Sequence, residues 1–167
     1  MIGTMRYGLS KLVMKTKHFP TNIAAVFLIF RKDKQIFLIK RANTGYKDGF
    51  WSLPAGHVDP DESFKQAGVH EAQEEVGVVF STDDLQFQHA MHRMNSDKSN
   101  RVNVFFKVKD WQGELHNAEP EKASEAGWFE IDNLPEPMVA YVKRALKHID
   151  KGVFYSEEGW PDSEAMA

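Results

Sequence analysis

The stretch from Gly56 to Val78 constrains this chain more than any other, because it concentrates carboxylates in a helical pattern. Glu71, Glu74 and Glu75 are spaced so that an α-helix would carry them on one face. Like charges at such spacing destabilise an isolated helix by about 0.2–0.5 kcal/mol per pair. A bound cation would neutralise them, and carboxylate oxygens suit Mg²⁺, Mn²⁺ or Ca²⁺.

A solvated acidic helix face is the alternative interpretation of these three glutamates taken alone. The flanking residues nevertheless predict a loop, a helix and a second loop. Pro54 to Gly56 form a tight bend, and Ser63 or Asp61 can cap the helix that follows. Gly77 is well placed to end that helix. This pattern predicts that the acidic groups are held in one place.

The same stretch resembles the Nudix box, G-x5-E-x7-R-E-U-x-E-E-x-G-U, in which U is an aliphatic residue. The matching residues are Gly56, Glu62, Glu71, Ala72, Glu74, Glu75, Gly77 and Val78. The one departure is His70, which stands where the family has arginine. With so many fixed positions at the right spacing, the chain is identified as a member of the Nudix family.

The composition fits one packed domain without a strong overall charge. The chain has 167 residues, 42% hydrophobic content and a net charge of -3. It therefore has no overall positive charge that would attract a nucleic-acid polymer. No apolar run approaches the length of a membrane span and no secretory signal is visible, so no membrane partner is expected. The absence of cysteine excludes disulfides and thiolate sites and fits a cytoplasmic protein.

Apolar patterning predicts strands on both sides of the acidic helix. Ile23–Phe30 and Ile36–Lys40 are expected to pair as a hairpin around the turn Arg31–Lys34. Further strands are expected at Val78–Phe80, Leu85–His92, Arg101–Val108 and from Trp128, with a polar loop at Trp111–Ala126 and a last helix at Met138–Ile149. Strands around one helix, followed by a second helix, indicate an α/β sandwich.

The resemblance sharpens this prediction to the Nudix α-β-α sandwich, with a mixed sheet between helices. We expect residues 1–167 to form a single Nudix domain whose best-matched core is 23–149. Residues 1–20 are interpreted as an N-terminal arm and 151–167 as a C-terminal tail. The aromatic residues of the tail, such as Trp160, predict that part of it docks on the domain.

The resemblance also implies a cofactor, Mg²⁺ with Mn²⁺ as the alternative. By position in the box, Glu71 and Glu75 would be its principal ligands, and the backbone carbonyl of Ala55 would join them. Glu74 would be a third ligand or would orient a water molecule. One glutamate must accept a proton from the attacking water, and the choice between Glu71 and Glu74 stays open.

Residues outside these glutamates supply further candidates. The segment Asn117–Lys122 resembles a loop of nucleotide-sanitising relatives, so Glu119 and Glu121 are candidate metal ligands, with an ordinary acidic surface loop as the alternative. Arg41 is a candidate for substrate phosphate, although exposed arginines at strand ends are common. Phe50 is a candidate for stacking on the substrate base.

The resemblance implies hydrolysis of a phosphoanhydride bond. We expect a Mg²⁺-dependent enzyme that converts a nucleoside triphosphate to the monophosphate and pyrophosphate, with nucleotide-pool sanitising as its role. The partner is then a small nucleotide. Alternatives are ADP-ribose, a nucleotide sugar or a CDP-alcohol as substrate, or a binding module with little activity, which the His70 departure motivates. Within the enzyme, His70 is expected to orient box glutamates by hydrogen bonding.

Overall fold

The computed structural model describes residues 22–161, which form two sheets and two α-helices. The prediction of an N-terminal arm at 1–20 lies outside this part of the chain. In chain order the elements are β1 (Asn22–Ile29), β2 (Arg31–Lys32), β3 (Gln35–Arg41), β4 (Trp51–Ser52), β5 (Ala55–His57), α1 (Phe64–Val76), the 3₁₀ turn η1 (Thr82–Asp84), β6 (Leu85–Met94), β7 (Asn100–Val108), β8 (Ala123–Glu130), α2 (Ala140–Asp150) and β9 (Tyr155–Glu158).

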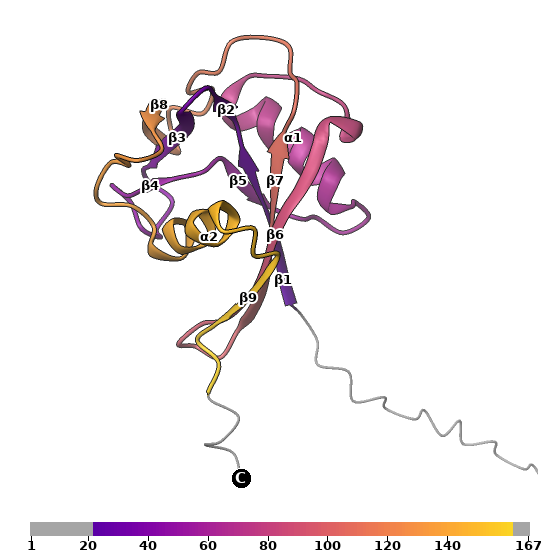
Figure 1. The fold of residues 1–167 in the computed structure, drawn as a ribbon, viewed down its shortest axis with the longest axis vertical. Helices are drawn as coiled ribbons and strands as arrows, with labels where there is room; N and C mark the ends of the chain where they lie inside the picture. Colours follow the sequence, from indigo (N-terminus) through magenta and orange to yellow (C-terminus); the bar gives the residue numbers. More distant parts are fainter. Residues whose placement is uncertain (1–21, 162–167) are drawn as a thin grey trace, which may run out of the picture.

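The larger sheet is mixed and has the strand order β5-β1-β7-β6-β9 (Figure 1). Strand β1 runs parallel to β7, and β9 runs parallel to β6, whereas β1–β5 and β6–β7 are antiparallel pairs. The smaller sheet is antiparallel and joins β3 to β2, β4 and β8. Its strands extend the same core on one side of the molecule.

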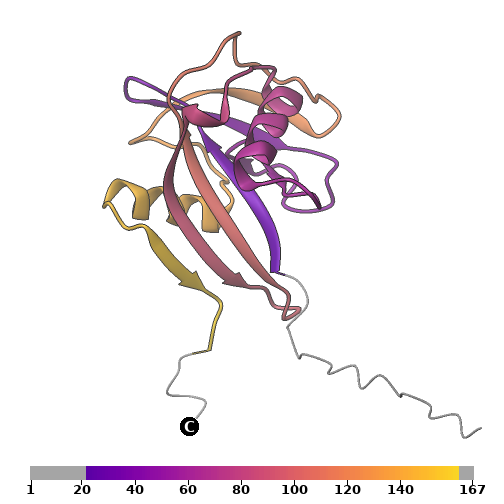
Figure 2. The same cartoon turned by 90° about the vertical axis from the view of Figure 1, so that its right-hand side faces the viewer.

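Strand β1 is buried on both faces, as its continuous apolar sequence predicts. Val26 and Leu28 pack in the cluster that α1 covers, while Phe27 and Ile29 alternate to the cluster that α2 covers. Figure 2 shows the two helices on opposite sides of the larger sheet. The predicted α/β sandwich, with a mixed sheet between helices, is therefore confirmed.

Helix α1 has both of the predicted end signals. The Ser63 hydroxyl accepts the backbone N–H of Gln66 at 3.3 Å, and the Gln66 side chain accepts the backbone N–H of Ser63 at 2.9 Å. Gly77 ends the helix at φ +72°, a left-handed conformation that favours glycine. These caps fix the helix limits, and its buried Ala67, Ala72 and Val76 fix the face toward the sheet.

The predicted hairpin between Ile23–Phe30 and Ile36–Lys40 is wrong in its pairing, although both strands exist. β1 lies in the larger sheet and β3 in the smaller one, and the tight hairpin partner of β3 is the short strand β2. Sequential strands are often neighbours, but periodicity alone names no partner. The two-sided burial of β1 is what places it inside the larger sheet.

Two further boundaries differ from the predictions. Residues Val78–Phe80 form no strand, and Val79 makes only an isolated bridge to Gln112. The last strand begins at Ala123, inside the predicted loop, because β8 pairs along most of β3 from Gln35 to Arg41. Pairing with a buried neighbour gives these polar residues a strand conformation that their own side chains do not indicate.

Part of the C-terminal tail docks on the sheet, as predicted. Strand β9 pairs with β6, and the Trp160 indole N–H donates to the backbone carbonyl of His92 at 3.1 Å. Phe154 and Tyr155, by contrast, are exposed. Neither α1 nor α2, the α-helices of residues 22–161, has the length and apolarity needed to cross a membrane.

The Ser63 cap can be tested by Ser63→Ala. The substitution removes the acceptor for the Gln66 N–H and should lower the free energy of unfolding by about 1 kcal/mol in urea titrations. Ser124→Ala is the matched control, since Ser124 is exposed and makes only a 3.5 Å contact. Equal stability of wild type and Ser63→Ala would show that the cap does not hold the start of α1.

Candidate functional site

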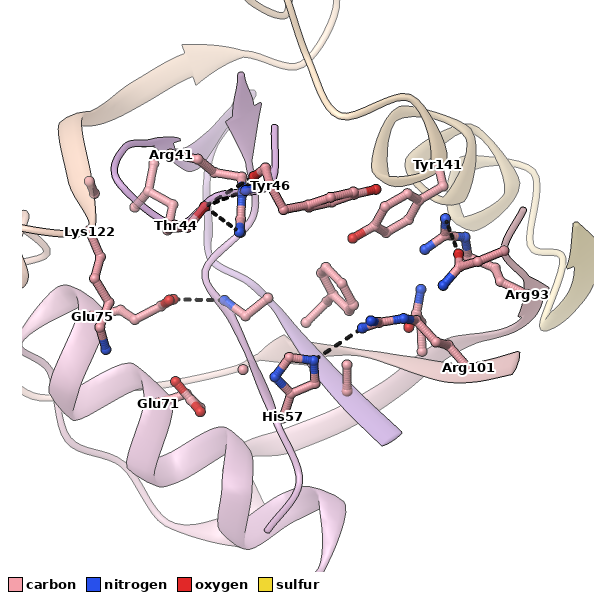
Figure 3. A pocket seen from close by; sticks show the side chains of 18 of the residues that line it. Arg41, Thr44, Tyr46, His57, Glu71, Glu75, Arg93, Arg101, Lys122 and Tyr141 are labelled. Carbon is pink, nitrogen blue, oxygen red and sulfur yellow. Dashed lines mark hydrogen bonds between the residues drawn. The ribbon is translucent and has the colours of Figure 1, made fainter. Parts of the chain in front are cut away.

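A cavity of about 880 Å³ opens between α1, the loop after β3, the turn between β6 and β7, and the start of α2. One end is acidic and is formed by Glu71, Glu75 and Glu119, with Lys122 beside them. The other end is formed by aromatic side chains and hydrogen-bond donors. Figure 3 shows Glu71, Glu75 and Lys122 on one side of the cavity and Arg93, Arg101 and Tyr141 on the other.

The acidic end is built where α1 meets β5. The Glu75 carboxylate accepts the backbone N–H of Ala55 at 2.8 Å. The Glu71 carboxylate lies directly on the backbone of Gly56: a Cβ atom added there would stand 1.7 Å from the carboxyl carbon of Glu71. Two glutamates one helical turn apart therefore converge on two consecutive residues of β5. Only a glycine at position 56 leaves room for the Glu71 carboxylate.

Burial disfavours the ionised form of the Glu71 and Glu75 carboxyl groups. It raises the pKa of Glu71 to about 7, with the charges of Glu74 and Glu119 adding to the rise. It raises the pKa of Glu75 to about 8, against the opposing effect of the Ala55 N–H, and the charges of Glu71 and Glu119 raise it further. A pair of carboxylates in this state is one that a cation would stabilise.

Glu119 is brought to the same end of the cavity by the loop before β8. Its carboxylate accepts from the Lys122 ammonium group at 2.6 Å, and this hydrogen bond raises the pKa of Lys122. Lys122 thus adds a positive charge at the rim of a negative cluster. Sequence reasoning named Glu119 but missed Lys122, although the two stand in the same short loop.

Two predicted acidic residues lie elsewhere. Glu74 is exposed and does not line the cavity, although its charge raises the pKa of Glu71. Glu121 is also exposed and does not line the cavity, and its backbone carbonyl accepts from the Asn43 side chain. The fold therefore brings Glu71, Glu75 and Glu119 together but leaves Glu74 and Glu121 outside the group.

His70 is exposed and contacts Glu62, not the carboxylates in the cavity. Its Nδ1 lies 3.0 Å from one oxygen of Glu62, whose other oxygen accepts the backbone N–H of Asp59 at 2.8 Å. Asp59 in turn lines the cavity. The contact of His70 with a box glutamate supports the loop between β5 and α1, and the orienting role of His70 in the reaction stays a prediction.

The two predicted substrate contacts occupy different environments. Arg41 lines the cavity, where its guanidinium donates to the Tyr46 carbonyl at 2.9 Å and to the Thr44 hydroxyl at 3.0 Å. These bonds shape the loop after β3. Phe50 packs against the core on the α2 side and is not a lining residue.

The end away from the glutamates was not predicted. It contains Tyr46, Arg93, Arg101, Asn103 and Tyr141, which come from four separate parts of the chain. Alternation along β7 places Arg101 and Asn103 on the α2 face with buried Phe105, but no sequence signal shows that a cavity opens there. Their convergence depends on the tertiary fold.

The residues at the acidic end fit a divalent cation of the Mg²⁺ type. The available metal ligands are oxygen atoms, and two of the ligand groups are half-buried carboxylates with raised pKa values. Within residues 22–161, no group of three or more His, Cys, Asp or Glu side chains is arranged to hold a metal ion. Mg²⁺ commonly takes one or two carboxylates and completes its shell with water and substrate phosphate, so two glutamates suffice.

Comparisons with known proteins agree with the fold and the box. The family model described as NUDIX domain matches residues 20–149. A protein from Methanocaldococcus jannaschii named ADP-ribose pyrophosphatase is 33% identical over 115 residues, 67% of this chain and 64% of its own length. A Proteus vulgaris protein named 8-oxo-dGTP diphosphatase is 29% identical over 93 residues, 54% of this chain and 79% of its own length.

Among solved structures, a MutT NUDIX hydrolase from Burkholderia pseudomallei superposes with a TM-score of 0.69 at 26% identity. The match covers 76% of this chain and 97% of that one. The chain spans 40 to 64% of the length of the first curated relatives that it matches. The box residues thus lie in a region that is shared by the family model, the relatives and this structure.

The raised pKa of Glu75 predicts that the free energy of unfolding depends on pH. A carboxyl group whose pKa is raised by folding stabilises the fold below its unfolded pKa of 4.5, and that contribution is lost as the pH rises through about 8. Glu75→Gln keeps an acceptor for the Ala55 N–H and removes the charge. In EDTA at pH 8.5, we expect its free energy of unfolding to exceed that of wild type by about 1 kcal/mol or more.

The matched control for this measurement is Glu114→Gln, which neutralises an exposed glutamate outside the cavity. The advantage of Glu75→Gln should shrink as the pH falls from 8.5 toward 5. A difference from wild type that stays constant over this range would contradict the assignment of the raised pKa to Glu75.

Proposed function

Because the chain belongs to the Nudix family, we propose that it hydrolyses a phosphoanhydride bond of a nucleotide with a divalent cation held by Glu71 and Glu75. The observation that supports this most is the convergence of the two carboxylates on Ala55 and Gly56 at one end of a large cavity. In this proposal Mg²⁺ is the cofactor, Mn²⁺ can replace it, and the Ala55 carbonyl adds a backbone ligand.

The residues at the acidic end then share the tasks of holding the cation, accepting a proton and binding phosphate, and Glu71 has the first two. A bound Mg²⁺ lowers the pKa of water and neutralises charge on phosphate oxygens. Glu71 lines the cavity whereas Glu74 is exposed, which supports Glu71 over Glu74 as the group that accepts the proton of the attacking water. Lys122 is placed to attract substrate phosphate, and Glu119 fixes its ammonium group.

Arg41 is a second cation near the acidic end. Its charge is close enough to act on the pKa of Glu75, and its guanidinium is held by the loop that it shapes. Phosphoryl transfer depends mainly on positioning and charge neutralisation. Two cations, Arg41 and Lys122, beside a carboxylate pair supply both requirements for a polyphosphate chain.

For the substrate, we favour a nucleoside triphosphate that is cleaved to the monophosphate and pyrophosphate. Support comes from the loop that places Glu119 and Lys122 in the cavity, and from the similarity to the P. vulgaris protein named 8-oxo-dGTP diphosphatase. ADP-ribose is the second candidate, favoured by the higher identity to the M. jannaschii protein named ADP-ribose pyrophosphatase.

A binding module with little activity has less support. That alternative rests on His70 replacing the arginine of the box. In this structure His70 is exposed and contacts Glu62, whereas Glu71 and Glu75 lie in the cavity. The replacement therefore leaves the carboxylate pair in place.

Gly56→Ala tests the carboxylate pair without removing either glutamate. The added methyl group would overlap the Glu71 carboxylate, which must move, and a displacement of this order can lower turnover about 100-fold. Stability should change by less than about 1 kcal/mol, because the group that moves is the end of a flexible side chain. Turnover with saturating Mg²⁺ and the unfolding free energy are the two measurements.

Gly127→Ala is the matched control for this variant, since a Cβ there makes only an ordinary 3.8 Å contact with Phe129. It should keep wild-type turnover. If Gly56→Ala also keeps wild-type turnover, the position of the Glu71 carboxylate has no part in the reaction.

The products distinguish the candidate substrates. Purified protein with Mg²⁺ is incubated with nucleoside triphosphates, ADP-ribose, a nucleotide sugar and a CDP-alcohol, and products are separated by anion-exchange chromatography. We expect a nucleoside monophosphate and pyrophosphate in equal amounts from the preferred triphosphate, because the cation site faces the polyphosphate chain. Nucleoside diphosphate and orthophosphate as main products, or faster cleavage of ADP-ribose, would contradict the proposal.

A further inference from the structure

The end of the cavity away from Glu71 and Glu75 offers aromatic surfaces to a ligand. Tyr46 is 47% exposed and lies on the loop after β3, and Tyr141 comes from the first turn of α2. The Tyr141 ring meets Phe27 edge-on at 5.9 Å. Figure 3 shows both tyrosines at the side of the cavity opposite Glu71 and Glu75. Such rings stack well on a planar heterocycle.

Two residues that line this end, Asn103 and Arg93, carry buried donors without acceptors within residues 22–161. Asn103 is 1% exposed, and its Nδ2 has no hydrogen-bond partner in the described part of the chain. The Nε of Arg93 also lacks a partner there, because the nearest Glu158 oxygen is 3.7 Å away, a distance that gives an ion pair but no hydrogen bond. An unpaired buried donor costs about 1–3 kcal/mol, so a ligand that supplies acceptors would be favoured.

Arg101 adds a donor group that is already oriented. Its Nη1 donates to the Nε2 of His57 at 3.1 Å, and arginine has no acceptor, so the direction of this bond is fixed. The nearby carboxylate of Asp97 is engaged by the backbone N–H of Ser99 at 2.9 Å and by its hydroxyl at 2.6 Å. This end of the cavity therefore offers mainly donors to a ligand.

We propose that this end is the base subsite and that it selects 6-oxopurines, with the base stacked on Tyr46 beside Tyr141 and its O6/N7 edge toward Arg101 and Asn103. The proposal rests on the proposed function and names its substrate class: guanine or hypoxanthine nucleotides. Adjacent O6 and N7 acceptors match an arginine fork, whereas adenine places an amino donor at position 6. An amide can turn to accept from that amino group, but a guanidinium cannot.

A segment beyond the family match helps to position this subsite. Glu158 of β9 accepts two hydrogen bonds from Arg144, at 2.8 and 2.7 Å, and pairs with Arg93 at 3.7 Å. The Arg93 guanidinium in turn lies 3.6 Å above the Tyr141 ring. Residue 158 follows the last residue of the family match, 149, so Arg93 is a positioning residue held by the C-terminal tail.

The test measures base selection by binding, apart from hydrolysis. The full chain in EDTA is titrated with GMP, IMP, AMP and UMP by calorimetry. GMP and IMP should bind about tenfold more tightly than AMP or UMP. Arg101→Gln should reduce this preference to about threefold or less, whereas Asn103→Leu should weaken the binding of GMP and AMP alike, since an amide can turn to suit either base. Lys107→Gln, on the same strand but outside the cavity, is the matched control and should keep the full preference.

Arg101→Lys separates base reading from a merely structural role. It keeps the charge and loses the planar fork, so it should lose the preference for GMP over AMP while its thermal midpoint stays near that of wild type. If the preference for GMP survives in Arg101→Lys and Arg101→Gln, if Asn103→Leu binds GMP as tightly as wild type does, or if AMP binds as tightly as GMP to wild type, the subsite proposal is overturned.

The hydrolysis assay keeps the two proposals apart. Cleavage of all nucleoside triphosphates at similar rates, together with equal binding of GMP and AMP, would overturn the subsite and leave the proposed function standing. Selective binding of GMP and IMP by a protein that cleaves no triphosphate would have the opposite meaning: the subsite would stand and the proposed function would fail.

Discussion

The contact of Glu71 and Glu75 with the backbone of Ala55 and Gly56 is the constraint on which the rest of the site depends. It holds two carboxylates partly out of water, and burial raises the pKa of both. The caps of α1, at Ser63 and Gly77, fix the limits of the helix that carries both glutamates. A functional site that opposes stability is a common compromise in proteins.

The cavity that leads away from this contact changes in character along its length. At the acidic end, Lys122 adds a cation beside the carboxylates, a combination suited to phosphate groups and a metal. At the other end, Arg101 and Asn103 present donors and Tyr141 presents an aromatic ring. A ligand that spans the cavity therefore needs a charged end and a planar end rich in acceptors, as a nucleotide has.

The sequence predicts those parts of the protein whose geometry is local. Capping residues and helical spacing were enough for α1 and for its carboxylates, because neighbours along one helix settle both. The pairing of β3 with β8 was missed, since periodicity gives the face of a strand but not its partner. Arg101 was missed for a related reason: its role depends on β7 and α2 meeting around a cavity. Glu74 shares the spacing of the box, yet it is exposed. The glutamates of the motif span a wider arc of α1 than the part that faces the cavity.

The central claim is that Glu71 and Glu75 together hold a divalent cation, and Mn²⁺ binding followed by electron paramagnetic resonance tests it most directly. The signal of free Mn²⁺ is measured as protein is added, with wild type and with the double variant Glu71→Gln/Glu75→Gln. Because both ligands carry the charge that attracts the ion, wild type should remove Mn²⁺ from solution and the double variant should remove far less. Equal binding by the two proteins would contradict the claim and place the cation elsewhere.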